Sequence, residues 1–233
     1  MRHFPLFRAF ALLFLGAAVQ AAPAPARAGD FPPVFQATAV YSSDLRPFTN
    51  WSGVMRRAHQ QIDTAPPCDP GAMVICRPAE WDAILADAVG ADLRNKVEIV
   101  NERINAHPYV PSVQNWGVTT YWETPFEFLT RNGQCQDYAI AKYMLLRAAG
   151  VPEDAMRVAI VHDDISRLDH AILLVDVDGV AMVLDNQSSL VLPASAVARY
   201  APYYAINETG WWLMKREGYS PQVATLPAGS AAN

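Results

Sequence analysis

The spacing of hydrophobic residues predicts helices in the first two thirds of the chain and strands in the last third. Apolar side chains recur at helical intervals over 51–62, 81–88 and 93–104, and we interpret these stripes as helix faces packed in a core. After residue 155 the pattern becomes extended, in the stretches MRVAIVH, HAILLVDV and VAMVLDN, and another hairpin is expected about 207–210. Helices followed by strands indicate an α+β fold with an antiparallel sheet.

Two local signals divide the middle of the chain. Residues 105–123 are rich in proline, glycine and aromatic side chains, so we expect a long irregular connection. The sequence TPFE then predicts a helix with Thr124 as its N-cap and a proline in its first turn. Asn132-Gly133 ends this short helix, and we expect the glycine to take the left-handed conformation. A second helix begins at once, at Cys135.

A predicted hairpin turn brings two polar side chains together. Asp178-Gly179, between HAILLVDV and VAMVLDN, is a strong signal for a two-residue hairpin loop. In that register Ile172 faces Asp185, and His170 lies on the same face as Ile172. His170 and Asp185 are then diagonal neighbours, about 7–8 Å apart at the backbone. A slip of one residue would place them on opposite faces.

The first 28 residues have the pattern of a signal peptide. Arg2, His3 and Arg8 precede a short apolar run, and small residues at 26–28 or 19–21 offer a cleavage site. The run is shorter than a membrane span requires, although an uncleaved N-terminal anchor is the alternative. We therefore expect an exported, periplasmic protein.

Removal of residues 1–28 would leave one domain over 29–219 and a tail over 220–233 that we expect to be disordered. It would also remove three arginines and no acid, so the formal charge would change from −5 to −8. A surface this acidic repels phosphate backbones, which disfavours nucleic acid as a partner.

The three cysteines divide into a pair and a single residue. Cys68 and Cys76 flank a turn sequence, and in an oxidising compartment we expect them to form a disulfide. Cys135 is then unpaired. At the first turn of a helix its thiolate is favoured, which makes it a candidate nucleophile. Burial as a small apolar residue is the alternative.

His170 and Asp185 supply what a nucleophilic thiol needs. One imidazole nitrogen takes the thiol proton while a carboxylate orients the other, as in acyl transfer by Cys-His-Asp enzymes. The hairpin register selects His170 from three candidate histidines, the others being His107 and His162. A locally satisfied strand histidine is the alternative for His170. For the oxyanion donor we consider the Cys135 backbone N–H together with three aromatic residues that core packing also explains: Trp116, Tyr121 and Trp122.

Four segments carry a resemblance to a known family. WETPFEFLTRNGQCQDYAIAKYMLLRAAGVP, HAILLV, VLDN and YAPYYAINETGWW resemble the bacterial transglutaminase-like cysteine peptidases, which include the LapG-type periplasmic proteases. The resemblance covers about residues 31–218. It implies a papain-like or transglutaminase-like α+β fold, with N-terminal helices packed on an antiparallel β-sheet and the nucleophile at a helix N-terminus. It also implies peptide-bond hydrolysis by Cys135, His170 and Asp185.

The resemblance further implies a substrate, a regulator and a metal. Family members release large surface adhesins, and with them cells from a biofilm, under the control of an inner-membrane receptor. Calcium binds in them at acidic residues of a GDCEDYA block, but this chain has Gln134 and Gln136 and retains only Asp137. Neutral amides bind calcium less strongly, so we expect an enzyme that depends weakly or not at all on the metal.

The sequence leaves three functions open. The first is a periplasmic cysteine endopeptidase acting on a protein substrate. The second is a transglutaminase-type acyltransferase that uses the same three residues to cross-link an amine. The third is a binding module that keeps the fold without catalysis.

Overall fold

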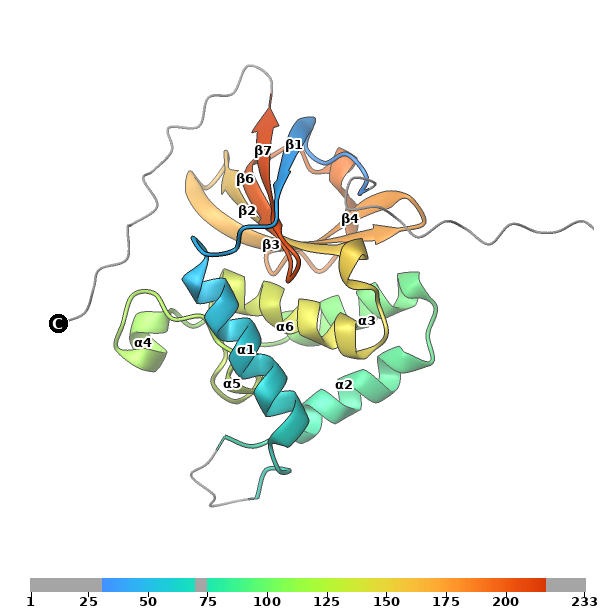
Figure 1. The fold of residues 1–233 in the computed structure, drawn as a ribbon. Coiled ribbons are helices and arrows are strands. Elements are labelled where there is room, and N and C mark those ends of the chain that lie inside the picture. The colour runs from blue at the N-terminus through green and yellow to red at the C-terminus, as the bar shows by residue number, and fades with distance from the viewer. Residues whose placement is uncertain (1–30, 70–74, 217–233) are drawn as a thin grey trace, which may run out of the picture.

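A layer of helices packs against a sheet in the computed structural model, which describes residues 31–69 and 75–216 (Figure 1). This is the expected α+β fold. The expected signal peptide at 1–28 and the expected tail at 220–233 lie outside the described residues. Residues 29–30 and 217–219, at the two ends of the expected domain, lie outside them as well. Within the described ranges, no helix has the length and apolar character needed to cross a bilayer.

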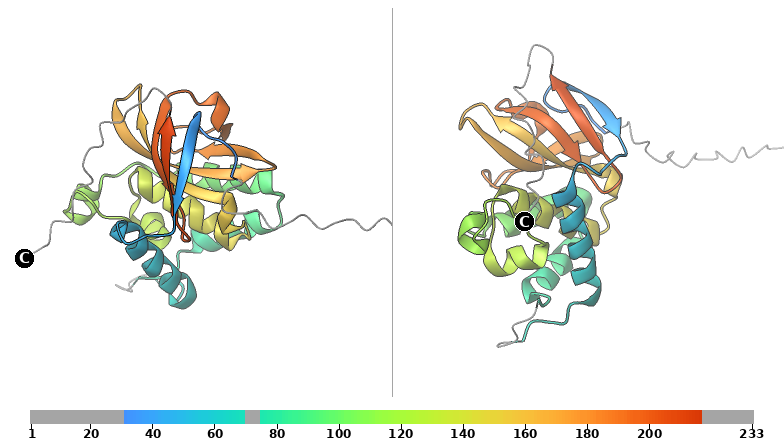
Figure 2. Two further views of the ribbon diagram at one scale, coloured as in Figure 1. Left: turned by 45° about the horizontal axis from the view of Figure 1, so that its top comes forward. Right: turned by 60° about the vertical axis from the view of Figure 1, so that its left-hand side comes forward.

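The helices lie on one side of the sheet (Figures 1 and 2). The three apolar stripes correspond to the first three helices, and a short helix interrupts the connection that was expected to be irregular, because Pro111 starts it and a left-handed Gly117 ends it. The α-helices among the described residues are α1 (Thr49–Thr64), α2 (Ala79–Val89), α3 (Leu93–Asn105), α4 (Ser112–Trp116), α5 (Pro125–Arg131) and α6 (Cys135–Ala148).

The sheet is antiparallel throughout, with strand order β1-β7-β6-β2-β3-β4-β5. Its strands are β1 (Ala37–Ser42), β2 (Met156–Asp163), β3 (Leu168–Val177), β4 (Val180–Leu184), β5 (Leu192–Pro193), β6 (Tyr200–Ile206) and β7 (Trp211–Arg216). β1 precedes all helices and pairs with β7 at the edge of the sheet, where its side chains are largely exposed. Its lack of apolar alternation explains why the sequence did not predict it.

Two hydrophobic cores cover the two faces of the sheet. The larger lies between the helices and one face, and nearly every side chain of α6 is buried in it or beside it. The smaller covers the other face, where Val34 and Phe35 pack with Trp212 and Met214. Arg157 also lies on that face, with its guanidinium 3.6 Å from the ring centroid of Trp212. Because nearly all of its side chains are buried, α6 is held rigidly at the centre of the helical layer.

The predicted disulfide between Cys68 and Cys76 is present, with the two Cα atoms 4.7 Å apart. It closes the connection between α1 and α2, where the backbone N–H of Cys68 also donates to the carbonyl of Arg77 at 3.1 Å. Cys135 is the free cysteine of the described residues, as expected.

The predicted turn between β3 and β4 is also present. Val177 pairs with Val180, and both Asp178 (φ 54°) and Gly179 (φ 83°) take left-handed conformations. This is the arrangement of a type I′ hairpin, whose twist matches that of the flanking strands. The turn therefore fixes the register of the whole β3–β4 pair.

We predict that Gly179→Ala lowers the free energy of unfolding by about 1 kcal/mol, since an L-residue is strained at this φ. A Cβ at Gly179 would meet no atom within 4 Å, so backbone strain alone sets the cost. Gly90→Ala is the matched control, because Gly90 has equally open surroundings and a right-handed backbone. Urea denaturation measures both, and equal stabilities for the two variants would contradict the prediction.

Candidate active site

Cys135 is the first residue of α6, and the backbone turns sharply before it. The prediction of a left-handed Gly133 is wrong, because the positive φ belongs to Asn132 instead, with φ 63° and an extended ψ of 176°. Gly133 has to be small for another reason: a Cβ there would lie 2.8 Å from the Cβ and Oδ2 atoms of Asp137. This close approach lets Asp137 accept the backbone N–H of Gln134 at 2.9 Å, which closes the first turn of α6.

His170 on β3 is hydrogen-bonded to Asp185, which directly follows β4. Nε2 of the imidazole lies 2.8 Å from Oδ1 of the carboxylate, and the two residues are only 5% and 6% exposed. The predicted register brings them together, since Leu173 pairs with Leu184 and the strands run on in step toward Asp185. With Nε2 engaged, Nδ1 is the ring nitrogen available to a second partner.

The thiol of Cys135 lies close enough to the imidazole to contribute to a raised pKa of His170. Burial lowers the pKa of His170, but Asp185 and Cys135 together outweigh it and raise the pKa from 6.5 to about 9. Burial also acts against ionisation of Asp185, yet hydrogen bonds from His170, Tyr200 and the Gln187 N–H hold its pKa below the ordinary value. The site therefore favours an imidazolium beside a carboxylate at neutral pH.

His170 lies on a stretch of β3 that has a free edge. Residues 168–172 pair with β2 but not with β4, whose pairing with β3 begins at Leu173. By register His170 shares a face with Ile172 and Leu174, which is the face opposite to the one that α6 covers. The contribution of Cys135 to the pKa of His170 places the start of α6 near this unpaired stretch.

Further hydrogen bonds hold Asp185 in place, and the sequence did not reveal them. The Tyr200 hydroxyl donates to Oδ2, and the backbone N–H of Gln187 donates to Oδ1 at 2.9 Å. The Asn105 amide donates to the backbone carbonyls of Asp185 and Ser188, at 2.7 and 2.8 Å. The carboxylate therefore has donors on both oxygens, and its own backbone is tied to α3.

A buried lysine lies behind this loop. Lys142, in the middle of α6, has no exposed surface, and its Nζ donates to Oδ1 of Asn101 at 2.8 Å. Burial lowers the pKa of Lys142 to about 7, against an opposing attraction to Asp185. The signal in the sequence was a charged residue inside an otherwise apolar helix, although its partner was not evident there.

The three aromatic candidates for the oxyanion lie along or just after α4. The indole N–H of Trp116 donates to Glu123 at 2.6 Å, and the hydroxyl of Tyr121 donates to Glu127 at 3.0 Å. Trp122 is partly buried and packs against the larger core. The role of these residues in binding an oxyanion stays a prediction.

A second polar cluster adjoins Cys135. Asp137 is completely buried, accepts the Glu123 N–H at 2.8 Å and receives the side-chain amide of Gln136 on both oxygens, at 3.3 and 3.2 Å. Burial raises the pKa of Asp137 to about 8, against the backbone donors of Glu123 and Gln134, and the charge of Glu123 raises it further. Burial raises the pKa of Glu123 as well.

These residues do not fit a calcium ion. Both oxygens of Asp137 already accept hydrogen bonds, and Gln136 presents N–H groups where a cation requires oxygen. Oε2 of Glu123 is buried without a hydrogen-bond partner, but a single such oxygen is far from the six to eight that calcium takes. Across residues 31–69 and 75–216, no group of three or more His, Cys, Asp or Glu side chains is arranged to hold a metal.

The other central histidines have different partners. His107 lies between Asn132, 3.0 Å from Nδ1, and Glu80, 3.3 Å from Nε2. His162 is 3.1 Å from Asp169. Of the histidines considered from the sequence, the structure joins His170 to the thiol.

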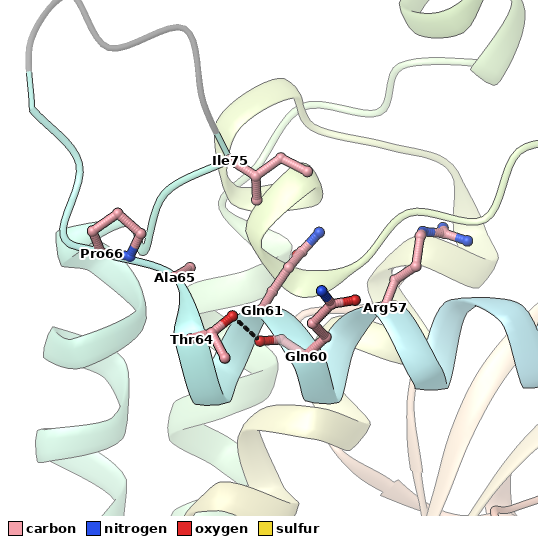
Figure 3. A pocket seen from close by; sticks show the side chains of 7 residues that line it. All are labelled: Arg57, Gln60, Gln61, Thr64, Ala65, Pro66 and Ile75. Atoms are coloured by element: carbon pink, nitrogen blue, oxygen red, sulfur yellow. Dashed lines mark hydrogen bonds between the residues drawn. The ribbon is translucent and has the colours of Figure 1, made fainter.

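A surface pocket of about 280 Å³ lies along the end of α1 (Figure 3). Its lining combines polar and apolar side chains and consists of Arg57, Gln60, Gln61, Thr64, Ala65, Pro66 and Ile75. It contains none of the residues around Cys135, although Arg57 donates to the carbonyl of Trp122. This pocket is separate from the candidate active site.

A cysteine at a helix start, facing a histidine and an acid from adjacent strands, is the arrangement of the transglutaminase-like and papain-like cysteine enzymes. A sequence model of the bacterial transglutaminase-like cysteine proteinases (BTLCP) matches residues 75–217, more than half of the chain. The chain belongs to this family and is a cysteine peptidase.

Solved structures of Legionella pneumophila LapG are similar to this chain at 30% identity. One has a TM-score of 0.52 and covers 57% of this chain and 75% of that one. A calcium-bound form has a TM-score of 0.53 and covers 61% of this chain and 80% of that one. An EGTA-treated form has a TM-score of 0.52 and covers 58% of this chain and 74% of that one. No curated protein matches the chain.

The raised pKa of His170 predicts a pH-dependent contribution to stability. A basic group with a folded pKa of about 9 and an unfolded pKa of 6.5 stabilises fully below pH 6.5 and loses this effect as pH rises through 9. The loss amounts to about 3 kcal/mol, since one pKa unit corresponds to about 1.4 kcal/mol.

Comparison of the wild type with His170→Gln isolates this contribution, because Lys142 and Asp137 titrate in both proteins. Urea denaturation between pH 6 and pH 9.5 should show the wild-type advantage shrinking as pH rises. An advantage independent of pH would show that His170 does not carry the raised pKa.

We also predict that Tyr200→Phe slows alkylation of Cys135 by iodoacetamide about three- to tenfold at pH 7. The change removes a donor to Asp185 and leaves the ring, so the carboxylate holds the imidazole less firmly. Tyr203→Phe is the control, because Tyr203 lies on β6 like Tyr200 but its hydroxyl donates to the exposed Asp169 of β3. Equal alkylation rates for the two variants would argue against a positioning role for Tyr200.

Proposed function

We propose that this cysteine peptidase is an endopeptidase in which Cys135 is the nucleophile, His170 the proton carrier and Asp185 the group that orients His170. The observation that carries the proposal is the imidazole itself, which is buried between the carboxylate and the thiol. A histidine placed this way exchanges a proton with sulfur without moving.

The reaction follows the positions of these atoms. The imidazolium favoured at His170 holds on Nδ1 the proton that the thiol gives up, and the thiolate sulfur attacks the carbonyl carbon of the scissile peptide bond. Collapse of the tetrahedral adduct breaks the C–N bond, and the imidazolium gives its proton to the leaving amine. Water, deprotonated by the same nitrogen, then hydrolyses the thioester and restores the thiol.

The adduct needs donors for its oxyanion. The backbone N–H of Cys135, in the first turn of α6, is our first candidate. Trp116 and Tyr121 already donate to Glu123 and Glu127, so Trp122 is the preferred second candidate among the aromatic residues.

Transfer to an amine is the second candidate chemistry, because the same thioester accepts an amine in place of water. The transglutaminase-like character of the family favours testing it, whereas its description as a family of cysteine proteinases favours hydrolysis. A purely binding role does not account for the joined thiol, imidazole and carboxylate.

We further propose that the enzyme is exported through its N-terminal segment and works in the periplasm on a protein substrate, with a large surface adhesin as the leading candidate. An inner-membrane receptor is the corresponding candidate regulator. Support comes from the signal-like sequence at 1–28 and from the similarity to LapG. We propose that calcium is not required, because the residues beside Cys135 do not fit it.

The central prediction is that Cys135→Ala abolishes cleavage while the fold is retained, since it removes one small side chain at a helix start. Periplasmic and surface proteomes of cells with either enzyme should differ by proteins shed only with the wild type. Circular dichroism and thermal melting of the variant confirm folding. Identical proteomes would contradict the proposed proteolysis.

The same pair of proteins separates hydrolysis from transfer. Wild-type enzyme is incubated with a glutamine-containing protein and a labelled primary amine. Incorporation of the label by the wild type but not by Cys135→Ala would favour transfer, and its absence together with substrate cleavage would favour the endopeptidase.

A further inference from the structure

The side chain of Gln136 joins two segments in front of the nucleophile. Its Nε2 lies 3.3 and 3.2 Å from the two carboxylate oxygens of Asp137 and 3.4 Å from the backbone carbonyl oxygen of Tyr121. Three oxygens thus converge on one amide nitrogen. Gln136 is only 7% exposed, so water does not compete freely for these contacts.

The other atoms of the cluster complete the same connection. Asp137 accepts the backbone N–H groups of Gln134 and Glu123, at 2.9 and 2.8 Å, so it ties the start of α6 to the chain before α5. The Ser112 hydroxyl donates to the Tyr121 carbonyl at 3.1 Å, which adds the start of α4. These hydrogen bonds therefore help to fix the segment from 121 to 123 beside Cys135.

Three oxygens around one centre are also what a bound cation gathers. Calcium would draw such oxygens to 2.3–2.6 Å and would need several carboxylates. Here the centre is a nitrogen that carries its own hydrogens, and the chain has amides where the family resemblance places acids. Cys135 lies directly against this group, with Sγ 3.7 Å from Oε1 of Gln136.

We propose that the Gln136 side-chain amide replaces calcium in this enzyme, cross-linking Asp137 to the Tyr121 carbonyl so that the nucleophile end of α6 is organised without a metal. The proposal rests on the proposed role of Cys135 as nucleophile. It predicts an enzyme that calcium neither stabilises nor activates. The Gln136 amide is covalently part of the chain, so the cross-link that it makes does not vary with the calcium concentration outside the cell membrane.

The test uses three variants of the full enzyme and two readouts, the melting temperature and the rate of Cys135 alkylation by iodoacetamide. Both readouts are measured in 1 mM EGTA and in 1 mM CaCl2. An alkylation rate counts as changed when it differs from that of the wild type by more than threefold. Gln136→Leu removes the donors and adds no charge. Gln134→Asp with Gln136→Glu restores the acidic pattern, and Gln60→Glu makes the same chemical change at an exposed position of α1.

The wild type and Gln60→Glu should behave alike in EGTA and in CaCl2. Gln136→Leu should melt roughly 3–8 °C lower and be alkylated at a rate changed by more than threefold, with no rescue by calcium. The double variant should show the same defects in EGTA and recover in CaCl2, with calcium binding measurable by calorimetry.

Two outcomes overturn the proposal. One is tight calcium binding by the wild type, with EGTA lowering its melting temperature; Glu123, whose Oε2 has no hydrogen-bond partner, and Asp137 would then be the ligands to examine. The other is a Gln136→Leu variant that matches the wild type in both readouts. Neither readout involves proteolysis, so failure to find a cleaved protein would affect the proposed function alone.

Discussion

The hydrogen bond between His170 and Asp185 is the interaction on which the proposed chemistry depends, and it exists only because two strands are held in one register. The two residues belong to β3 and to the chain just beyond β4, which a two-residue turn joins. Side chains alternate along a strand, so a slip of one position would separate the imidazole from the carboxylate completely. A turn at the far end of the hairpin therefore controls the geometry of the site.

Burial strengthens this hydrogen bond, but it also requires that the buried charges have hydrogen-bond partners. An ionised carboxylate in a buried position is costly unless donors surround it, and Asp185 receives them from His170, Tyr200 and the Gln187 backbone. The same burial would expel the charge of His170, were it not for the acid and the thiol on its two sides. His170 and Asp185 are thus interdependent, because the ionised form of each is stabilised by the other.

The sequence was most informative where local rules decide the structure. Hydrophobic spacing located α1, α2 and α3, the capping pattern located α5, and Asp178-Gly179 fixed the β3–β4 register and hence the pairing of His170 with Asp185. It failed where a contact joins distant segments. β1 pairs with β7 across most of the chain, and Tyr200 and Asn105 reach Asp185 from other elements, without any local pattern. Gly133 shows a subtler error, since its smallness serves the contact with Asp137 and not a left-handed backbone.

The charges around the sulfur explain why amides at 134 and 136 are consistent with a working nucleophile. A buried carboxylate next to a thiol opposes formation of the thiolate, and a bound cation would offset such carboxylates. With Gln134 and Gln136 in place, that repulsion is smaller from the start, and less positive charge is needed to balance it. Asp137 keeps its position through N–H donors, which include the Gln136 amide. The proposed independence from calcium therefore agrees with the neutral side chains at 134 and 136, since both follow from a smaller negative charge beside the thiol.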